Sequence, residues 1–410
     1  MQKTAVRTTN QLSHEQKLVM ASTASGFSLE NMDIMFLSFA LTPIIAELHI
    51  SSGAAGLIGS ITNVGMLVGG ALFGLLGDKI GRVKTFSHTI LIFAVATALM
   101  AFANNMWMIY VLRFLAGIGA GGEYGVGIAL IAESFNHDRI GRMTSVAAIG
   151  GQIGAIIAAL AASFILPLWG WHALFLMGVL PVVLTFFVRE HLHESDAFLA
   201  AKKEAKAKHE RVAFSELFKT PHLATQTLGL MVMTIVQIAG YFGLMNWLPV
   251  IVQKQQGLSV SGSALWMVAT ICGMCLGMAV FGNILDHLGP RVAFGLFLTA
   301  SALIVFAITM ARSSVVLVVI GAVVGFCSNG MFGGYGAVIS QLYPARIRST
   351  ANNVIMNVGR AIGGFSSVVI GVLMDHYSLM VTMGFLSALY IISLITMLSL
   401  PGLRKLTPAK

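Results

Sequence analysis

A succession of long apolar segments constrains the fold of this chain more than any other feature. A helix needs about 20 apolar residues to cross a bilayer, and hydropathy with loop signals divides the 410 residues into twelve segments of that order. Charged residues make up 10% of the chain, whereas soluble domains carry about 25%. We therefore predict an all-α membrane protein with spans at 18–46, 54–77, 85–104, 107–133, 143–167, 171–188, 224–252, 262–285, 291–311, 314–341, 350–375 and 380–400.

The distribution of positive charge predicts how these spans are oriented. Of the 25 Lys and Arg residues, 21 fall in the N-terminus, the even-numbered loops and the C-terminus. Lys254 and Arg312 fall in odd-numbered loops, and Arg113 and Arg360 fall inside spans. This bias predicts that both termini lie in the cytoplasm and that the protein lies in the cell inner (plasma) membrane. The net charge of +9 therefore reflects orientation, and we expect no nucleic-acid partner.

Two pairs of charged residues lie inside the first and fourth spans. Glu30 and Asp33 are three residues apart and therefore share a helix face. Arg113 and Glu123 flank a stretch rich in glycine, with six glycines between residues 117 and 127. A charge at bilayer depth costs roughly 2.5–3.5 kcal/mol on insertion scales, so each should have a compensating role. We predict that the fourth span lines a substrate pathway, that Asp33 lies near mid-membrane, and that the glycines permit close helix packing.

An internal repeat with a shift of 208 residues relates the two halves of the chain. The shift aligns Gln152 with Arg360 and Asp33 with Tyr241. Two related six-helix halves with a site between them near the midplane are a recurrent transporter plan. We predict bundles at 1–188 and 224–410, a charged cytoplasmic linker at 189–223, and a monomer. The repeat also aligns three residues of one loop with three of another: Gly74, Asp78 and Gly81 with Gly282, Asp286 and Gly289.

Polar residues concentrate on the spans that this repeat makes equivalent, the first, fourth and fifth with the seventh, tenth and eleventh. Asn353, Asn357 and Arg360 follow i, i+4, i+7 spacing and share one face. Gln152 lies in a stripe of small residues. Two roles for its side chain are equally compatible with the sequence: a hydrogen bond between helices and a contact to substrate. We predict that the substrate is bound by Arg360, Arg113, Asn357, Tyr241, Gln152, Gln237, Asn329 and Tyr335.

The turn GLLGDKIGRVK after the second span combines an acid, a turn glycine and several cations. Asp78 can accept hydrogen bonds from exposed helix N–H groups, and the cations keep the turn in the cytoplasm. The segment AESFNHDRIGR after the fourth span adds further charge at the same rim. We predict a conformational role, and a cytoplasmic gate comprising Asp78, Lys79, Gly81, Arg82, Glu133, Arg142 and Asp286.

These motifs resemble those of the major facilitator superfamily over the whole chain. GLLGDKIGRVK is similar to its loop 2–3 signature, and GNILDHLGPR is similar to a weaker copy in the second half. RFLAGIGAGGEYG with AESF downstream resembles the proton-linked metabolite symporters, among them the aromatic acid, lactate-type and sialic-acid-type symporters. The resemblance implies twelve helices in two pseudo-symmetric bundles.

The aromatic acid symporters offer the most detailed match. The resemblance implies that Glu30 and Asp33 correspond to their acidic pair, Arg113 to their arginine opening the fourth helix, and Glu133 to their glutamate at its cytoplasmic end. Glu30 departs from the usual aspartate of that group, and the glycine preceding the second acid is absent.

The two arginines in opposing halves predict an anionic substrate, because a guanidinium matches a carboxylate with paired hydrogen bonds. We predict that Arg360, helped by Asn357, holds a substrate carboxylate. Arg113 pairs with an acid in the empty state, joins in binding, or is wholly structural. Because no histidine lies mid-membrane in the sequence, the coupling proton is expected on a carboxylate: Asp33 first, Glu123 second, with Glu30 beside them.

The sequence thus predicts proton-coupled uptake of a small organic anion, an aromatic acid or another carboxylate, by alternating access. The alternative is a proton-coupled drug or cation efflux antiporter, although residues 143–166 lack the proline of the drug antiporters' glycine-proline signature. A sensor or scaffold would need a larger soluble segment than 189–223, and no nucleophile triad or phosphate loop indicates an enzyme. Cys272 and Cys275 have C-x-x-C spacing without a second ligand pair, so we expect no metal and no cofactor. The lipid bilayer is the remaining partner.

Overall fold

The structure is a computed structural model that describes residues 12–50, 52–192, 194, 199–200, 203, 214–256, 260–310 and 313–406. Ten stretches of these residues are long and apolar enough to cross a membrane. One of them, Ile140–Leu184, includes two predicted spans, and the 35-residue helix α1 (His14–Leu48) is a further long helix outside the ten. The described helices therefore cover all twelve predicted spans, and the all-α, twelve-helix architecture is confirmed.

The N-terminal bundle contains six long helices and two short 3-10 turns. In α5, Gly170 has a φ of 73°, a left-handed conformation that glycine adopts without strain, and the helix bends there. The two predicted spans at 143–167 and 171–188 therefore meet at a kink and not at a loop. The elements are α1, α2 (Ser52–Ile80), α3 (Arg82–Leu99), η1 (Met100–Phe102), α4 (Met106–Ser134), α5 (Ile140–Leu176), η2 (Met177–Val179) and α6 (Leu180–His191).

The C-terminal bundle is more broken than the sequence predicts. Three predicted spans, 291–311, 314–341 and 350–375, each contain two successive helices. Two of the breaks fall beside glycines, which weaken a helix interior. The elements are η3 (Phe214–Phe218), α8 (Pro221–Gln256), α9 (Val260–Leu288), α10 (Pro290–Ile304), α11 (Ala307–Met310), α12 (Ser314–Gly330), α13 (Phe332–Leu342), η4 (Ala345–Ile347), α14 (Arg348–Gly363), α15 (Ser366–His376), α16 (Leu379–Ser399) and α17 (Pro401–Lys405).

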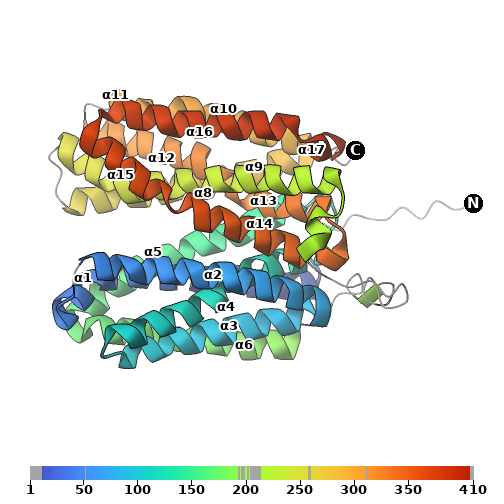
Figure 1. The fold of residues 1–410 in the computed structure, drawn as a ribbon, viewed down its shortest axis with the longest axis horizontal. Coiled ribbons are helices and arrows are strands. Elements are labelled where there is room, and N and C mark those ends of the chain that lie inside the picture. Colours follow the sequence, from blue (N-terminus) through green and yellow to red (C-terminus); the bar gives the residue numbers. More distant parts are fainter. Residues whose placement is uncertain are drawn as a thin grey trace, which may run out of the picture.

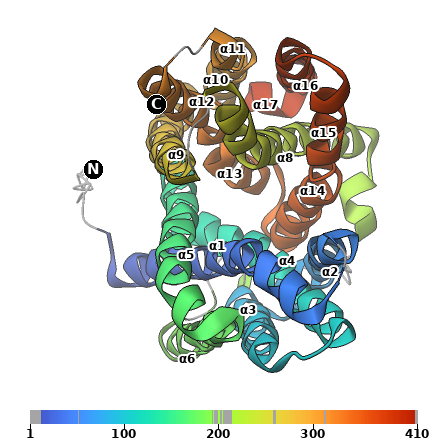
Figure 2. The same cartoon turned by 90° about the vertical axis from the view of Figure 1, so that its left-hand side faces the viewer.

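The two bundles lie side by side, with α1–α6 in one and α8–α16 in the other (Figure 1). Viewed along the helices, α14 lies against α2, and α9 lies against α5 (Figure 2). The turn between α2 and α3, the start of α5 and the start of α14 meet at one end of the molecule. We call this the basic end, because Arg82, Arg142 and Arg348 lie there.

Small residues allow the two bundles to touch toward the basic end. A methyl group added at Gly74 of α2 would lie 3.0 Å from the Cα atom of Thr350 in α14. On the other side of the boundary, a methyl group at Gly333 would lie 2.6 Å from the Cα atom of Ser145 in α5. Backbones that approach so closely leave no room for side chains, so the described contacts close the space between the bundles at this end.

Candidate functional site

Arg113 and Asp33 form a buried ion pair inside the N-terminal bundle. The guanidinium donates two hydrogen bonds, from Nη1 to Oδ1 at 3.0 Å and from Nη2 to Oδ2 at 2.5 Å. The hydroxyl of Thr97 donates to the same carboxylate at 3.0 Å, and the guanidinium lies 5.8 Å from the ring centre of Phe175. The side chains are 1% and 5% exposed. Arg113 is therefore paired with an acid of α1 in this structure, an arrangement that fits both a pair in the empty state and a wholly structural role, and the Thr97 hydroxyl joins α3 to it.

Arg360 and Glu30 form a second ion pair, and this one crosses the boundary between the bundles. Nη1 of Arg360 in α14 lies 2.7 Å from Oε1 of Glu30 in α1. The guanidinium also lies 5.7 Å from the ring centre of Tyr124 in α4. Its side chain is 14% exposed, whereas that of Glu30 is 2% exposed. Glu30 and Asp33 share a helix face as predicted, yet they bind arginines from opposite halves.

Glu123 is the third acid of this region, and it differs from the other two. It is 1% exposed, and neither carboxylate oxygen has a hydrogen-bond partner among the described residues. Its carboxyl group packs against Gly26 of α1, where an added methyl group would collide with Oε1 and lie 3.0 Å from Phe86. The neighbouring Tyr124 ring stacks on Phe27 at 5.3 Å. Glu123 is therefore a buried acid in a largely aromatic and apolar setting.

The asparagines of α14 bind the backbone of α4 across the boundary. Asn353 accepts a hydrogen bond from the N–H of Gly125 at 2.8 Å and donates to the carbonyl of Gly122 at 3.1 Å. The amide of Asn357 donates to the carbonyl of Gly121 at 2.8 Å and to that of Asn353 at 2.8 Å. The glycines of α4 thus expose their backbone to α14, which confirms their predicted role in close packing. The Asn357 amide therefore contacts the backbone of α4 and not the Glu30 carboxylate that Arg360 binds.

The remaining predicted lining residues have different surroundings. Gln237 donates to the amide oxygen of Asn329 at 2.9 Å, so these two join α8 to α12 inside the C-terminal bundle. Tyr335 is 1% exposed and donates to a carbonyl of α8 at 3.2 Å, which makes it part of the bundle's core. Gln152 is buried in α5, and Tyr241 is half-buried in α8. The hydroxyl of Tyr335 is therefore already hydrogen-bonded within the protein.

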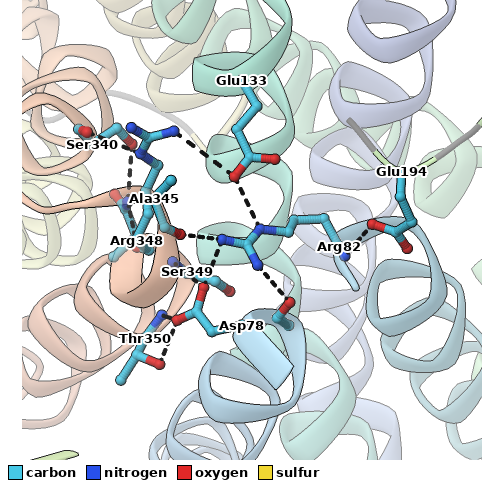
Figure 3. A network of polar contacts seen from close by, with 11 residues as sticks. Asp78, Arg82, Glu133, Glu194, Ser340, Ala345, Arg348, Ser349 and Thr350 are labelled. Carbon is cyan, nitrogen blue, oxygen red and sulfur yellow. Dashed lines mark hydrogen bonds and ion pairs between the residues drawn. The ribbon is translucent and has the colours of Figure 1, made fainter. Parts of the chain in front are cut away.

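Three of the predicted gate residues, Asp78, Arg82 and Glu133, form a network with Arg348 at the basic end (Figure 3). Arg82 lies 2.8 Å from Asp78 and 3.1 Å from Glu133, and it donates to the carbonyl of Ala345 in the other bundle. Arg348 lies 3.8 Å from the same oxygen of Glu133. The side chains of Asp78, Arg82 and Glu133 are fully buried. Charges from both bundles therefore neutralise one another at this end.

Asp78 also caps a helix of the opposite bundle. Its carboxylate accepts from the N–H of Ser349 at 3.2 Å, from the N–H of Thr350 at 2.8 Å and from the Thr350 hydroxyl at 2.6 Å. These groups begin α14, whose own N-cap residue, Ile347, provides no side-chain cap. The predicted role of Asp78 as an acceptor for helix N–H groups is confirmed, and the helix belongs to the other half of the chain.

Asp286, its counterpart in the repeat, makes the reciprocal contact. Its two carboxylate oxygens accept from the N–H groups of Gly141 and Arg142, each at 2.8 Å. These groups begin α5, whose N-cap residue, Arg139, provides no side-chain cap either. Each bundle therefore supplies the acid that caps a helix of the other.

Glu194 is a residue of this network that the sequence did not indicate. It follows α6 and accepts from the N–H of Arg82 at 2.7 Å and of Lys84 at 3.2 Å, so it caps α3 (Figure 3). Gly81 has a φ of 133°, as a turn glycine should, and leaves room for this carboxylate. Lys79 is exposed. No motif spacing could have indicated Glu194, because it approaches α3 from a separate segment.

Comparisons with known proteins place this arrangement in a family. The family model described as Major Facilitator Superfamily matches residues 23–367. A solved structure of XylE, a proton:xylose symporter, superimposes with a TM-score of 0.79 at 15% identity, covering 95% of this chain and 97% of that chain. At this identity the similarity concerns the fold alone.

Relatives of known name match over most of their length. A protein of Haemophilus influenzae, named as a candidate metabolite transport protein, is 36% identical over 97% of this chain and 98% of its own. The cis,cis-muconate transport protein of Acinetobacter baylyi is 28% identical over 88% of both chains. The niacin transporter NiaP of the same organism is 26% identical over 84% of both chains. Fold, motifs and relatives agree, and the chain belongs to the major facilitator superfamily.

Proposed function

We propose that this protein is a secondary active transporter that imports a small organic anion together with protons, by alternating access. The observation that carries the proposal is the Arg360–Glu30 pair, which joins the two bundles through a guanidinium that already holds a carboxylate. The named relatives add support, because muconate and niacin are both carboxylates. The transported anion is therefore expected to bind Arg360.

The surroundings of Arg360 favour a planar acid. The Tyr124 ring lies 5.7 Å from the guanidinium, and Tyr241 of α8 is near enough to interact electrostatically with Arg360. A guanidinium beside aromatic faces binds the carboxylate of an aromatic acid, while the rings stack on its apolar part. An aromatic or conjugated carboxylate fits these groups better than a sugar, which lacks the charge.

The proton is expected to act first on Asp33. As long as Asp33 is ionised, it holds Arg113 with two hydrogen bonds. A proton on Asp33 would remove one charge of this buried pair and release the guanidinium, which would alter the packing of α1 against α4. Alternate exposure of this acid to the two sides would couple its protonation to the rocking of the bundles.

The basic end is the cytoplasmic end in this proposal, because positive charge favours that side. The two bundles are in contact there, through the caps from Asp78 and Asp286. The anion would therefore enter from the opposite, outer side and leave after these contacts open.

Efflux of a drug or cation is the rival function. A cation would need a carboxylate free to receive it, yet Asp33 and Glu30 each hold an arginine. Glu123 alone of the three acids has no partner among the described residues, and it is 1% exposed. The pairing of the acids therefore favours the anion.

An uptake screen in proteoliposomes with an imposed pH gradient tests the function. The panel contains nicotinate, benzoate, cis,cis-muconate, lactate and sialic acid, with a lipophilic cation as the rival substrate. We expect accumulation of at least one carboxylate when the outside is acidic. Arg360→Lys should weaken its binding sharply, because an ammonium lacks the paired donors of a guanidinium. Uptake of the cation alone, or unchanged affinity in the variant, would contradict the anion assignment.

Asp33→Asn tests the coupling. The variant should lose proton-driven accumulation but retain exchange of labelled for unlabelled substrate. Because removing one partner of a buried pair costs about 3–5 kcal/mol, a double variant, Asp33→Asn with Arg113→Gln, removes both charges and serves as the folding control. Full accumulation in a folded Asp33→Asn protein would exclude Asp33 as the coupling group.

A further inference from the structure

We propose that Glu30 is an internal stand-in for the substrate carboxylate, and that its displacement from Arg360 draws one proton onto Glu30, next to Glu123. This inference rests on the proposed function, since it requires that an organic anion binds Arg360. It adds a second proton-binding place, distinct from the Asp33–Arg113 pair, and it makes proton uptake a direct consequence of substrate binding.

The Arg113–Asp33 and Arg360–Glu30 pairs differ in how easily a substrate carboxylate could replace the protein's own carboxylate on the arginine. Arg113 is 1% exposed and holds Asp33 with two nitrogens. Arg360 is 14% exposed, and its one hydrogen bond to Glu30, from Nη1, is 2.7 Å long. A carboxylate that enters between the bundles can therefore reach the Arg360 guanidinium, whereas the other arginine is enclosed. Arg360 is the exchangeable partner.

The surroundings of Glu30 decide what happens after displacement. Glu30 is itself 1% exposed, so it does not reach water when it loses its partner. On α4 it is opposed by Glu123 and Tyr124, and on α14 by Arg360. Tyr241 of α8 is a further titratable group near the arginine. Apart from Arg360, these neighbours carry no positive charge that could take its place.

Glu123 makes a second buried negative charge unfavourable. Its carboxyl group lies against Gly26, one helical turn before Glu30 on α1, and has no hydrogen-bond donor among the described residues. A buried carboxylate without hydrogen-bond donors is costly, so we assign the neutral, protonated form to Glu123 as part of this proposal, with Arg360 as the positive charge that the two acids share. When the substrate takes Arg360, the ionised Glu30 would stand beside this neutral acid with no counter-ion.

The balance of the exchange is simple. The substrate carboxylate replaces the Glu30 carboxylate on Arg360, and no covalent bond is broken. The released Glu30 then receives one proton that enters from the aqueous solution with the substrate, and it becomes a neutral acid. The net event is the entry of one anion and one proton, which leaves the charge of the site unchanged. Binding energy is thereby linked to protonation, because the anion binds well only where the proton can follow.

The test measures proton uptake on binding, in weakly buffered detergent solution with a pH-sensitive dye. The probes are nicotinate, benzoate and cis,cis-muconate, added to the purified full-length protein. We expect close to one proton taken up for each acid bound to wild type. The apparent Kd should rise tenfold for each unit of pH increase, as required for one linked proton. Glu30→Gln should lose this uptake, bind the probe more tightly at high pH, and show a flat pH profile.

Two comparisons make the result specific. Glu47→Gln, which alters a half-exposed glutamate at the C-terminal end of α1, should keep the wild-type uptake. Infrared spectra of the ligand-free protein should contain a protonated carboxyl band that is lost in Glu123→Gln and kept in Glu30→Gln. Addition of nicotinate to wild type should produce a second such band.

The outcomes separate the two proposals. If neither these three acids nor the lactate and sialic acid of the uptake panel bind wild type, the proposed function is overturned, and the role of Glu30 is overturned with it. If an acid binds but Glu30→Gln retains the proton uptake, the stand-in alone is wrong and the proton goes to another group such as Asp33. If folded Glu30→Gln no longer binds any probe, Glu30 contributes to the bound state and is not displaced from it. Each result therefore supports or overturns the inference.

Discussion

Two kinds of residue determine how the helices of this protein contact one another: buried charged residues and glycines. Asp33 and Glu30 are three residues apart, yet one binds an arginine of its own bundle and the other an arginine of the opposite bundle. Glycines set the contacts between helices in another way. An added methyl group at Gly69 of α2 would collide with the backbone carbonyl of Ile118 in α4, and one at Gly121 would collide with that of Met66. Backbone cannot move aside as a flexible side chain can, so these glycines determine how close the helices lie.

The contrast between two glycines of α2 gives a residue-scale prediction. Gly69→Ala should destabilise the protein by about 1–3 kcal/mol, the usual cost of overpacking. Gly59→Ala is the matched control, because nothing lies within 4 Å of its added methyl group. Thermal unfolding in detergent measures both. Gly59→Ala should keep or slightly raise the melting temperature, because alanine is a better helix former than glycine. An equal fall of melting temperature in both variants would contradict packing as the cause.

At the scale of elements, two helices depend on the other bundle for their N-terminal caps. The first N–H groups of α14 and α5 have no partner within their own helices. Asp78 and Asp286 accept their hydrogen bonds instead. Each acid also faces the positive end of a helix dipole, which adds to the attraction. The caps exist only while the bundles are in contact at the basic end, so they stabilise that one arrangement.

Removal of one cap should loosen this end. Asp286→Ala should cost about 1 kcal/mol of the closed arrangement, or roughly a five-fold shift toward opening. The readout is maleimide labelling of Ser145→Cys, a fully buried position between the bundles, in a protein whose native cysteines have been replaced. Asp138→Ala, an exposed acid just before α5, is the matched control. Equal labelling rates in the two variants would mean that the cap does not hold the bundles together.

At the scale of the whole molecule, two bundles meet along α2–α14 and α5–α9. A methyl group built on Gly77 would lie 3.3 Å from the Cβ atom of Ser349 in the other bundle. This is close to the separation of about 3.5–4.5 Å that a disulfide needs. In the proposed alternating-access cycle, rigid bundles that rock past each other would have to separate these atoms.

A cross-link at this point should therefore stop transport. Gly77→Cys with Ser349→Cys, in a background without native cysteines, should oxidise readily in the ligand-free protein and abolish uptake, and a reductant should restore it. Single variants treated with the same oxidant control for damage. Undiminished uptake by the fully cross-linked protein would contradict separation of the bundles at the basic end.

Many residues of the candidate site could be predicted from the sequence, because charged residues are rare inside apolar spans. Glu30, Asp33, Arg113, Glu123 and Arg360 all attract notice as charges inside apolar spans. Their pairing was not visible, because helix spacing shows which residues share a face but not which helix that face meets. Asn357 illustrates the limit: its spacing places it on the face of Arg360, and the structure directs its amide to the backbone of α4.

The sequence by itself determined the class of the molecule: twelve apolar spans, a repeat, and five charged residues inside those spans. These follow from local composition, since water and lipid sort residues without regard to the rest of the fold. Only the tertiary structure decided that Asp33 pairs with Arg113 of its own bundle while Glu30 pairs with Arg360 of the other bundle. It alone revealed that the acids of the repeated loop cap helices of the opposite bundle. Such choices depend on contacts between distant segments, which exist only once the bundles have packed.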